Sequence, residues 1–558
     1  MRESLKKAVS TALESAGISG AEVSLEHPAD LKNGDYSSGV ALQYAKQAGT
    51  APRSLAEKIV AALGTIDGVA KIEVAGAGFI NFYLTTSVLA EAVETARKED
   101  MPARLPGQGG WGRGALNAGK KIMMEYTDPN PFKEFHIGHL MSNAIGESIA
   151  RLLQFSGAEV RRANYQGDVG PHVSKAVWAV KNHKVAGGSW GDAYVTGNKA
   201  YETDEAAKKE IDEINAKIYS RSDELINAIY DEGREVSLAH FEELYTTLGT
   251  KFDFYFFESE TAGKGVEIVK AHPQTFEQSD GAIVYKGEKA GLHTRVFITS
   301  KGLPTYETKE LGLAEMKSEK WSFDESVTVT AHEQADYFAV VLAAMKEVMP
   351  KIAAKVQHVS HGMMRFAEGK MSSRTGNVIT GESLLADLTE AAKVRAAESR
   401  ADNADILAQQ IAVAAIKYQI LKQASGKDII FDRERALSLE GDSGPYLQYA
   451  HARACAIGEK AKEQNVTAKV DAHVEPNNLT RLLHRFPEAV EYAAAHSEPH
   501  LLTNYLLEFA AAFNSWYAQV HVLDGTPEAA HKVALVDAVR RTLKNGLWIL
   551  GIPAPERM

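Results

Sequence analysis

The sequence predicts a protein of several domains: a small α+β domain, then an α/β domain built on a parallel sheet, then an all-α helical bundle. Three observations lead to this prediction. Residues 121–157 contain an apolar strand, a proline-broken turn and a helical pattern, the order found at the first crossover of a nucleotide-binding parallel sheet. Residues 71–84 alternate as a pair of strands does, and from about residue 386 the apolar spacing is helical. A chain of 558 residues is also too long for one hydrophobic core.

The composition is typical of a globular protein kept in a reducing compartment. Hydrophobic residues make up 45% and charged residues 24% of the chain, with no apolar run long enough for a bilayer and no secretory signal. Cys455 is the only cysteine, which excludes an internal disulfide and a cysteine-based zinc site. The net charge of −11 weighs against indiscriminate binding to nucleic acid. We therefore expect a cytoplasmic protein that does not associate with membranes.

Residues 1–105 form the first predicted domain. Helical patterns over Leu5–Leu13 and Leu55–Leu63 flank the alternating segment Lys71–Leu84, which indicates a small α+β fold. The aromatic residues of that segment could stack on RNA bases, but an alternating strand favours core packing for most of them: Phe79, Phe82 and Tyr83. The Gly- and Pro-rich stretch Pro102–Gly119 is the expected linker to the next domain.

The second predicted domain covers residues 115–385. It includes an insertion at about 187–260, because the middle of this region is polar and charged with only weak helical spacing. We expect the insertion to lie between the halves of the nucleotide-binding fold, outside the sheet. Later β-branched segments are expected to be buried strands: Ala282–Tyr285, Arg295–Ile298 and Ser326–Thr330.

His136 and His139 stand at the start of the helix that follows the first strand of this domain. A helix start presents unpaired N–H groups and the positive end of the helix dipole, so it attracts phosphate. Residues three apart share one face of the first turn, so both imidazoles can point at a triphosphate, while Gly138 leaves room for an adenine ring. Two ordinary solvated histidines, or a fragment of a metal site, would give the same pattern.

The segment Gly369–Asn377 reads Gly-Lys-Met-Ser-Ser-Arg-Thr-Gly-Asn. It is basic, rich in hydroxyl groups and bounded by glycines, which suits a loop that closes over phosphates. Taken alone, it could equally be a polar surface loop with two incidental positive charges. That explanation becomes poor when the His-Ile-Gly-His helix start precedes the segment in one chain.

Residues 386–558 are predicted to form the all-α bundle. Three aromatic side chains there could stack on bases, and we expect core packing for two of them: Trp516, Tyr517 and Trp548. The apolar spacing of the region predicts helices over Leu384–Glu398, Ala404–Leu421, Tyr446–Lys462, Leu479–Ala495, His500–Leu523 and Ala529–Leu550.

The helix start and the basic loop together resemble the two signature sequences of class I aminoacyl-tRNA synthetases. A closer resemblance, to the arginyl-tRNA synthetase family, covers nearly the whole chain. These pieces share no compositional reason to occur in this order, which makes the resemblance specific. The motifs that carry it are Gly34–Tyr36, Gly78–Phe82, Glu125–Asn130 followed by Lys133 and His136, Gly167–Gly170, Thr305–Glu310, Gly444–Ala450 and Asn545–Met558.

The resemblance implies a class I Rossmann-like catalytic domain, an N-terminal domain that contacts the outer corner of tRNA, and a C-terminal bundle that binds the anticodon. It implies an arginine–tRNA ligase. Such an enzyme activates L-arginine with ATP to arginyl-adenylate, transfers it to the 3′-terminal ribose of tRNA(Arg), and releases AMP and pyrophosphate. Mg²⁺ is the implied cofactor, bound with the substrate ATP, and no protein metal site or editing domain is expected. We expect a monomer whose partners are tRNA(Arg), ATP and L-arginine.

Positions within the matching motifs also assign the site residues that the resemblance implies. The catalytic residues would be His136, His139, Lys370 and Lys133. The ATP-binding residues would be Gly138, Gly167, Asp168, Gly170, Met371, Ser372 and Ser373. The arginine-binding residues would be Glu125, Asn130, Tyr306, Glu310 and Gln334.

This chain departs from the family pattern at two of these positions. Ser373 stands where the signature has a second lysine, and we hypothesise that Lys133 supplies the missing charge. Glu310 stands where the family commonly has aspartate. Four residues after Tyr306, it would share a helix face with that ring, so that ring and carboxylate together could hold a guanidinium group. The alternatives are a solvated lysine for Lys133 and ordinary surface polarity for Glu310 and Gln334.

Three other functions share part of this pattern. A class I synthetase for another amino acid would carry both signatures. A small adenylyltransferase shares the His-x-Gly-His phosphate corner, but does not need the N-terminal unit or the long helical C-terminal region. An RNA-binding paralogue that has lost catalysis would not need both histidines and Lys370.

Overall fold

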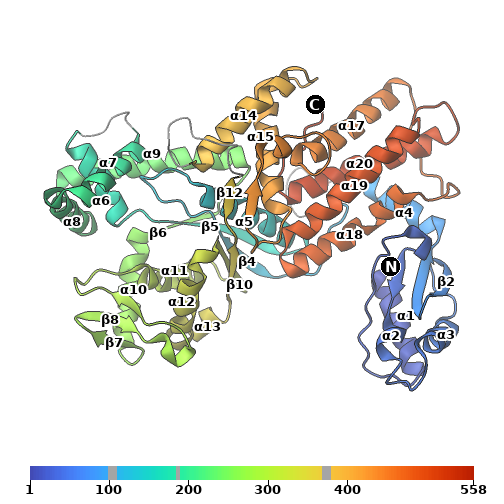
Figure 1. Cartoon of the computed structure of the whole chain (residues 1–558), viewed down its shortest axis with the longest axis horizontal. Helices are drawn as coiled ribbons and strands as arrows, with labels where there is room; N and C mark the ends of the chain where they lie inside the picture. The colour runs from blue at the N-terminus through green and yellow to red at the C-terminus, as the bar shows by residue number, and fades with distance from the viewer. Residues whose placement is uncertain (99–109, 184–188, 367–378) are drawn as a thin grey trace. The chain divides into compact units, whose positions relative to one another are not determined.

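The computed structural model describes residues 1–98, 110–183, 189–366 and 379–558 (Figure 1). The described chain divides into two compact units. The boundary between the units falls inside the C-terminal helices, which therefore contribute residues to both. The first unit contains Met1–Asp100, Ala454–Pro487 and Glu508–Thr542, and the second contains Met101–Arg453, Glu488–Leu507 and Leu543–Met558.

The first unit begins with the small α+β fold that the sequence predicts. Its sheet has the order β1-β3-β2 and is antiparallel. The predicted strand pair and both helical patterns are confirmed, whereas β1 was not predicted because three residues are too few to show alternation. The elements are α1 (Arg2–Ser15), η1 (Leu31–Asn33), β1 (Tyr36–Ser38), α2 (Val40–Tyr44), α3 (Pro52–Leu63), β2 (Val69–Ala75), β3 (Phe79–Leu84) and α4 (Thr86–Lys98).

The aromatic residues of β3 have different environments. Phe82 is 0% exposed in the core, as expected, whereas Phe79 at the strand start is 44% exposed. Tyr83 is half-buried, and its hydroxyl donates to the carbonyl of Lys32 at 2.7 Å. Of these three side chains, Phe79 therefore offers the most open aromatic surface.

The Gly34–Tyr36 motif of this unit has a structural explanation. Gly34 has a φ of 92°, and a Cβ there would lie 2.6 Å from the carbonyl oxygen of Phe82, so only glycine fits. The Asp35 carboxylate is buried, accepts the N–H of Leu84 at 2.7 Å and pairs with Arg481. The motif thus ties the N-terminal sheet to a C-terminal helix of the same unit.

The second unit contains, among its described residues, a five-stranded parallel sheet in the order β11-β10-β4-β5-β6. Strand order reverses between β4 and β10, so their carboxyl ends border the crevice where doubly wound sheets bind ligands. The expected Rossmann-like domain is therefore confirmed. The strands are β4 (Lys121–Glu125), β5 (Glu159–Gln166), β6 (Phe254–Phe257), β10 (Glu325–Ala331) and β11 (Val356–His361).

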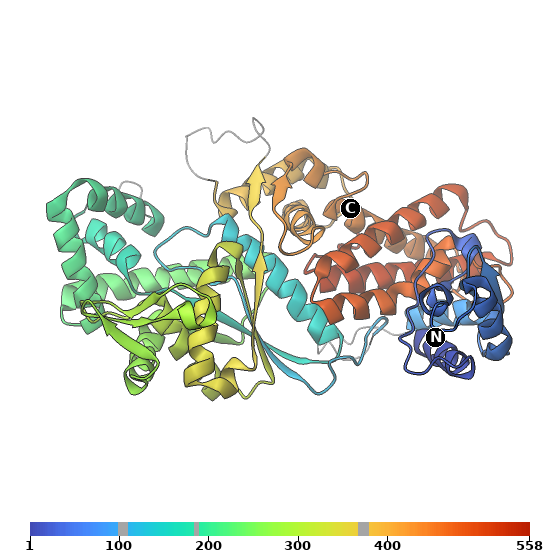
Figure 2. The ribbon, with the colours of Figure 1, turned by 60° about the horizontal axis from the view of Figure 1, so that its bottom comes forward.

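Helices cover this sheet, and the long helix α5 runs beside its strands (cyan in Figure 2). Helices α10 and α11 pack against each other, next to a separate antiparallel sheet of β7, β8 and β9. The remaining elements are α5 (Ile137–Phe155), α6 (Pro171–Lys181), α7 (Trp190–Thr203), α8 (Glu205–Ser220), α9 (Glu224–Leu248), α10 (Glu258–Ala271), β7 (Phe276–Ser279), β8 (Ala282–Tyr285), η2 (Gly287–Ala290), β9 (Arg295–Ile298), α11 (Tyr306–Lys320), η3 (His332–Gln334), α12 (Ala335–Val348) and α13 (Pro350–Ala353).

The region expected as an insertion, residues 187–260, is only partly outside the sheet. Helices α7, α8 and α9 occupy most of it and pack with α6. Its last part is different, because β6 pairs in parallel with β5 and forms the edge of the main sheet. We assigned this four-residue strand to the insertion because the helices that precede it are polar. The expected strands at 282–285, 295–298 and 326–330 are all confirmed as strands, although only the last joins the parallel sheet.

The C-terminal region is helical, and each predicted helix is present. Two short additions were not predicted: α16 and the parallel pair of three-residue strands β12 and β13. The elements are β12 (Met364–Phe366), α14 (Gly381–Ala397), α15 (Ala404–Leu421), β13 (Ile429–Phe431), α16 (Arg433–Ala436), α17 (Gly444–Glu463), α18 (Asn478–His496), α19 (Pro499–Gln519) and α20 (Ala529–Ile549).

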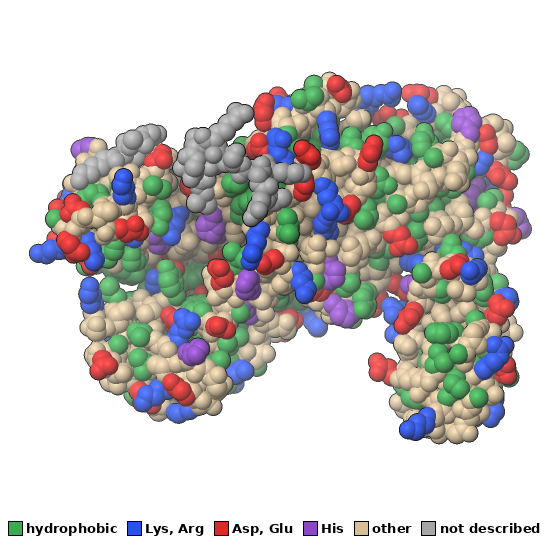
Figure 3. Space-filling model, in the orientation of Figure 1, with side chains coloured by type: hydrophobic (Ala, Val, Ile, Leu, Met, Phe, Trp, Pro, Cys, Tyr) green, Lys and Arg blue, Asp and Glu red, His purple; other side chains and the backbone are tan. Residues whose placement is uncertain are grey.

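Acidic and basic side chains are interspersed over the face seen in Figure 3, and the chain has 73 acidic and 62 basic residues. None of the helices in the described ranges is both long enough and apolar enough to cross a membrane.

Two cations join helix ends in the second unit. Lys417 of α15 is 0% exposed, and its Nζ donates to the carbonyls of Leu248 at 2.6 Å and Gly551 at 2.9 Å. Arg151 of α5 donates to the carbonyls of Trp548 at 2.8 Å and Gly249 at 2.6 Å. The C-terminal ends of α9 and α20 carry carbonyls without helical partners, and the N–H groups of Lys417 and Arg151 satisfy them.

This arrangement predicts a pH-dependent stability. Burial, and then repulsion from Arg151, lowers the pKa of Lys417 to about 7. Between that value and the ordinary lysine pKa near 10.4, the unfolded chain binds a proton that the folded protein lacks. Stability should therefore rise with pH across this window, by up to about 1.4 kcal/mol per pH unit. Lys417→Met should flatten the rise in melting temperature between about pH 7 and pH 9.

Lys427→Met provides the control, because Lys427 is exposed. Its melting temperature should follow that of the wild type at every pH. Equal slopes in all three proteins would contradict the assignment to Lys417.

Candidate active site

The histidine pair occupies the first turn of α5. His136 is the N-cap residue, with φ −88° and ψ 170°, and its backbone N–H donates to Nδ1 of His139 at 3.3 Å. The imidazole rings stack with their centroids 3.5 Å apart. A Cβ on Gly138 would lie 3.2 Å from Nδ1 of His136, so glycine lets that ring fold back over the helix start. Both imidazoles therefore lie beside the N–H groups of the first turn, where anions bind.

Both imidazoles are neutral near pH 7. Burial is the main cause that lowers the pKa of His139, with further contributions from His136 and Lys133. Burial and Lys133 also lower the pKa of His136, the more exposed of the pair. Because Nδ1 of His139 accepts an N–H, the proton of this ring is on Nε2. His139 can thus donate a hydrogen bond to an anionic oxygen without carrying charge.

Lys133 lies in the turn between β4 and α5, half-buried, with Nζ 4.9 Å from the centre of the Tyr194 ring. Burial and then repulsion from Lys175 lower its pKa. Its charge acts on both His136 and His139. The fold therefore places this lysine near the histidine pair, and its catalytic role stays a prediction.

One buried and two half-buried carboxylates gather at the carboxyl end of β4. Glu125 is 2% exposed, and its Oε2 lies 2.9 Å from Nζ of Lys317 on α11. Burial and then repulsion from Glu125 raise the pKa of Glu310 to about 8. The same two causes raise the pKa of Asp128 well above its ordinary value. Carboxylates that raise one another's pKa in this way favour a cation at the same place.

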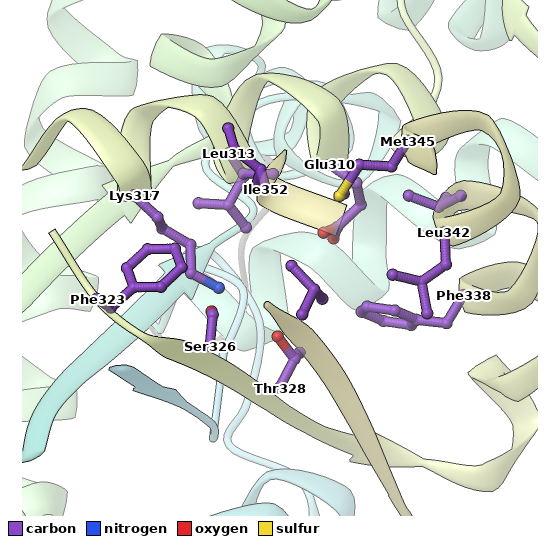
Figure 4. A pocket seen from close by; sticks show the side chains of 13 residues that line it. Glu310, Leu313, Lys317, Phe323, Ser326, Thr328, Phe338, Leu342, Met345 and Ile352 are labelled. Carbon is purple, nitrogen blue, oxygen red and sulfur yellow. The ribbon is translucent and has the colours of Figure 1, made fainter. Parts of the chain in front are cut away.

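Glu310 also lines a cavity of about 20 Å³ between α11, α12 and β10 (Figure 4). The carboxylate of Glu310 and the ammonium of Lys317 both point toward this space, with Thr328 of β10 opposite. A cavity of this volume has room for about one water molecule and not for an amino acid. It can therefore hold a water molecule beside the Glu310 carboxylate.

A second buried ion pair adjoins the turn after β4. Glu258 is 4% exposed, and its Oε2 lies 2.5 Å from Nζ of Lys309. A Cβ on Gly167 would lie 2.2 Å from Oδ1 of Asn130 and 3.2 Å from Oε1 of Glu258, so the glycine permits this close approach. Nζ of Lys309 in turn lies 5.2 Å from the centre of the Tyr306 ring. This ion pair therefore lies close to Asn130, Gly167 and Tyr306.

Asp168 has four donors within the protein. Its carboxylate accepts the N–H of Ser259 at 2.9 Å, the Ser259 hydroxyl at 2.7 Å, the Tyr230 hydroxyl at 3.2 Å and Nε of Arg234 at 3.0 Å. These bonds join the end of β5 to α9 and α10. Gly170, with a φ of 126°, is the N-cap of α6. The contact of Asp168 with ATP stays a prediction beside this structural role.

The other predicted residues lie at the margin of the cluster or outside the described chain. Tyr306 begins α11 and is 58% exposed, and Gln334 is exposed at the end of η3, just after β10. Thr380 pairs with His136 in an isolated antiparallel bridge. The remaining predicted residues fall outside the described ranges: Lys370, Met371, Ser372 and Ser373.

Three residues of this site were missed in the sequence: Glu258, Lys309 and Lys317. Lys309 stands next to Glu310 and Glu258 directly follows β6, so both adjoin positions of interest. Nothing local marks them as a pair, since their carboxylate and ammonium groups come from segments 51 residues apart.

The arrangement can hold a group of each charge side by side. The helix start, the neutral imidazoles and Lys133 favour an anion, and Glu125, Asp128 and Glu310 favour a cation. Among the described residues, no group of three or more His, Cys, Asp or Glu side chains is arranged to hold a metal ion.

Comparison with known families matches the chain along its length. The family described as tRNA synthetases class I (R), catalytic domain, matches residues 107–433. The arginyl tRNA synthetase N terminal domain matches residues 3–84, and the DALR anticodon binding domain matches residues 447–558.

Individual relatives agree. The arginine–tRNA ligase of Treponema pallidum is 29% identical over 575 residues, covering 97% of this chain and 96% of the relative. That of Borrelia garinii subsp. bavariensis is 31% identical over 469 residues, covering 79% and 80%. The solved arginyl-tRNA synthetase of Thermus thermophilus superimposes with a TM-score of 0.80 at 26% identity, covering 100% of both chains. With its catalytic-domain match extending over more than half of the sequence, this chain belongs to the arginyl-tRNA synthetase family of class I aminoacyl-tRNA synthetases.

Proposed function

We infer that this protein is an arginine–tRNA ligase, which activates L-arginine with ATP and transfers the arginyl group to tRNA(Arg). The observation that carries this inference is the carboxylate cluster of Glu125, Asp128 and Glu310 beside the helix start of α5. A guanidinium group is best held by planar carboxylates, and a triphosphate by a helix N-terminus. The family relationship makes those ligands arginine and ATP.

The reaction has two steps. A carboxylate oxygen of arginine attacks the α-phosphorus of ATP in line, the bond to the β-phosphate breaks, and pyrophosphate leaves. A hydroxyl of the 3′-terminal ribose of tRNA, the 2′-hydroxyl first in this class, then attacks the activated carbonyl carbon and AMP leaves. Such transfer depends on positioning and on neutralising charge, so no protein nucleophile is needed.

The roles of individual residues follow from their chemistry. His136 and His139 would donate hydrogen bonds to the phosphate oxygens as charge develops, each stabilising the transition state by about 2–4 kcal/mol. Lys133 and Lys370 would carry the positive charge that balances pyrophosphate. Glu310 and Tyr306 would hold the guanidinium group of arginine. Asn130 and Glu125 would hold its amino-acid end, with Gln334 also in the pocket. Gly138, Gly167, Asp168, Gly170, Met371, Ser372 and Ser373 would border ATP.

Other ligands follow from the same proposal. Mg²⁺ would arrive with ATP, because it keeps several waters and is held mainly by substrate phosphates. The C-terminal helices would read the anticodon and the N-terminal domain would contact the outer corner of tRNA. We propose that the enzyme acts as a monomer in the cytoplasm.

ATP–pyrophosphate exchange with arginine, run with and without tRNA(Arg), tests the proposed function. Arginine should support exchange and should become attached to tRNA, and lysine should be rejected by roughly 10⁴-fold, because the site hydrogen-bonds a planar group. Charging with a different amino acid in preference to arginine would refute the proposal.

Lys133→Ala should lower the exchange rate at saturating substrate by about 10²-fold, because the charge that Ser373 does not supply is then lost. The effect should be on kcat more than on KM, since the charge on pyrophosphate develops as the bond breaks. Lys199→Ala is the matched control, because Lys199 is an exposed lysine of the neighbouring helix α7. A near-normal rate in Lys133→Ala would exclude the compensating role.

The raised pKa of Glu310 predicts a pH-dependent KM for arginine. At pH 6.5 most Glu310 is protonated, because its pKa is about 8. The affinity for the guanidinium group should therefore rise with pH, by up to about tenfold per unit, until the carboxylate is ionised. Burial lowers the pKa of both His136 and His139, which moves their titration toward the acid side of this window.

Glu310→Gln should raise KM for arginine at pH 8 and remove most of its pH dependence, while KM for ATP stays constant. An unchanged pH profile in this variant would show that another group holds the guanidinium.

A further inference from the structure

Glu382 links α14 to two other segments of the active-site region. It lies in the first turn of α14, and its Oε1 accepts the backbone N–H of Phe135 at 3.0 Å. Its Oε2 lies 2.9 Å from Nε2 of His240 on α9. The carboxylate therefore bonds to α9 through one oxygen and to Phe135 through the other. Phe135 directly precedes His136.

The peptide groups of Phe135 are held on both sides by α14. Besides the bond to Glu382, the carbonyl of Phe135 accepts the N–H of Gly381 at 2.8 Å. A Cβ on Gly381 would lie 3.1 Å from that carbonyl oxygen, so the two segments are in close contact. The bridge between Thr380 and His136 continues the same pairing. Few displacements of Phe135 relative to α14 are compatible with all these contacts.

The position of Phe135 determines where the histidine pair lies. His136 follows it directly and caps α5, and its own N–H holds His139. The Phe135 side chain is 1% exposed, with its ring centroid 5.3 Å from that of His139 and 6.3 Å from that of Phe241, the neighbour of His240. A shift of the Phe135 backbone would therefore move both imidazoles, and misplacement by about 1 Å can lower a rate by about 10²-fold.

We propose that Glu382 is a positioning residue for arginine activation: through the N–H of Phe135 it holds His136 and His139 in place for the α-phosphate, and His240 orients its carboxylate. This rests on the proposed function. An acidic residue in the first turn of a helix can also act only by stabilising that helix against its dipole. In that case its removal would change the stability of the protein without changing the rate at full occupancy of the site.

Arginine-dependent ATP–pyrophosphate exchange distinguishes these roles. Glu382→Ala should lower kcat by at least about tenfold, with KM for arginine and ATP changed by less than about threefold, because the loss is in the transition state. Glu382→Gln keeps an oxygen that can accept the N–H of Phe135 and should recover most of kcat. Glu390→Ala is the matched control: Glu390 lies on α14, and its Oε2 is 2.7 Å from Nζ of Lys393.

His240→Ala removes the second partner of the Glu382 carboxylate. Because the His240 side chain is half-exposed, kcat should fall by only about two- to fivefold. This variant keeps the proposal testable if Glu382→Ala does not fold. Unchanged kcat in Glu382→Ala or His240→Ala, or an equal loss in Glu390→Ala, would overturn it. So would a Gln variant as slow as the Ala variant.

Hydrogen–deuterium exchange separates this inference from the proposed function. The segment 133–141 should exchange faster in Glu382→Ala than in the wild type or Glu390→Ala, whatever the activity of the protein. If the wild type lacks arginine-dependent exchange in the presence of tRNA(Arg), the proposed function fails. If it has that activity and the segment is equally protected in all variants, the positioning role fails.

Discussion

The connection between β4 and α5 is the constraint on which both halves of the site depend. Within a few residues it supplies carboxylates, an amide, a lysine and the histidine pair. Its backbone is unusual, because Thr127, Asp128 and Phe132 have positive φ values of 80°, 45° and 70°. Such a conformation costs of order 1–3 kcal/mol for each residue and persists only where surrounding contacts impose it.

Those contacts come from distant parts of the second unit. The N–H of Thr127 donates to the Ser142 hydroxyl at 3.0 Å, and the N–H of Phe132 donates to the Ser237 hydroxyl at 3.0 Å. The Asp128 carboxylate accepts the N–H of Tyr165 at 2.7 Å. Helix α5, helix α9 and strand β5 therefore hold the turn in its strained shape. The turn can be short and still aim the anion-binding and cation-binding groups at one crevice, since the rest of the fold prevents it from relaxing.

How much of this could be predicted depends on how far apart the interacting residues lie in the chain. Long helices with regular apolar spacing, such as α15 and α20, were predicted within a few residues because each carries its own signal. Strand β1, with three residues, has too few positions for a period to show, and β6 was assigned to the insertion because polar helices precede it. The pairs of Glu125 with Lys317 and Glu258 with Lys309 could not be predicted, because only the folded sheet brings their segments together. The resemblance named Glu125 and Glu310, but not the lysines that neutralise part of the charge around them.

At the expected phosphate site, neutral histidines can donate hydrogen bonds, whereas a lysine can neutralise charge. Since burial keeps His136 and His139 neutral at pH 7, the pair can donate hydrogen bonds but cannot balance the charge of a triphosphate. That charge must be met by cations, and Lys133 is the described lysine whose field acts on both imidazoles. Burial and then repulsion from Lys175 lower its pKa, and a phosphate nearby would favour its protonated form. Anion binding therefore favours the charged form of Lys133. That charge adds to burial, the larger cause, in lowering the pKa of both imidazoles.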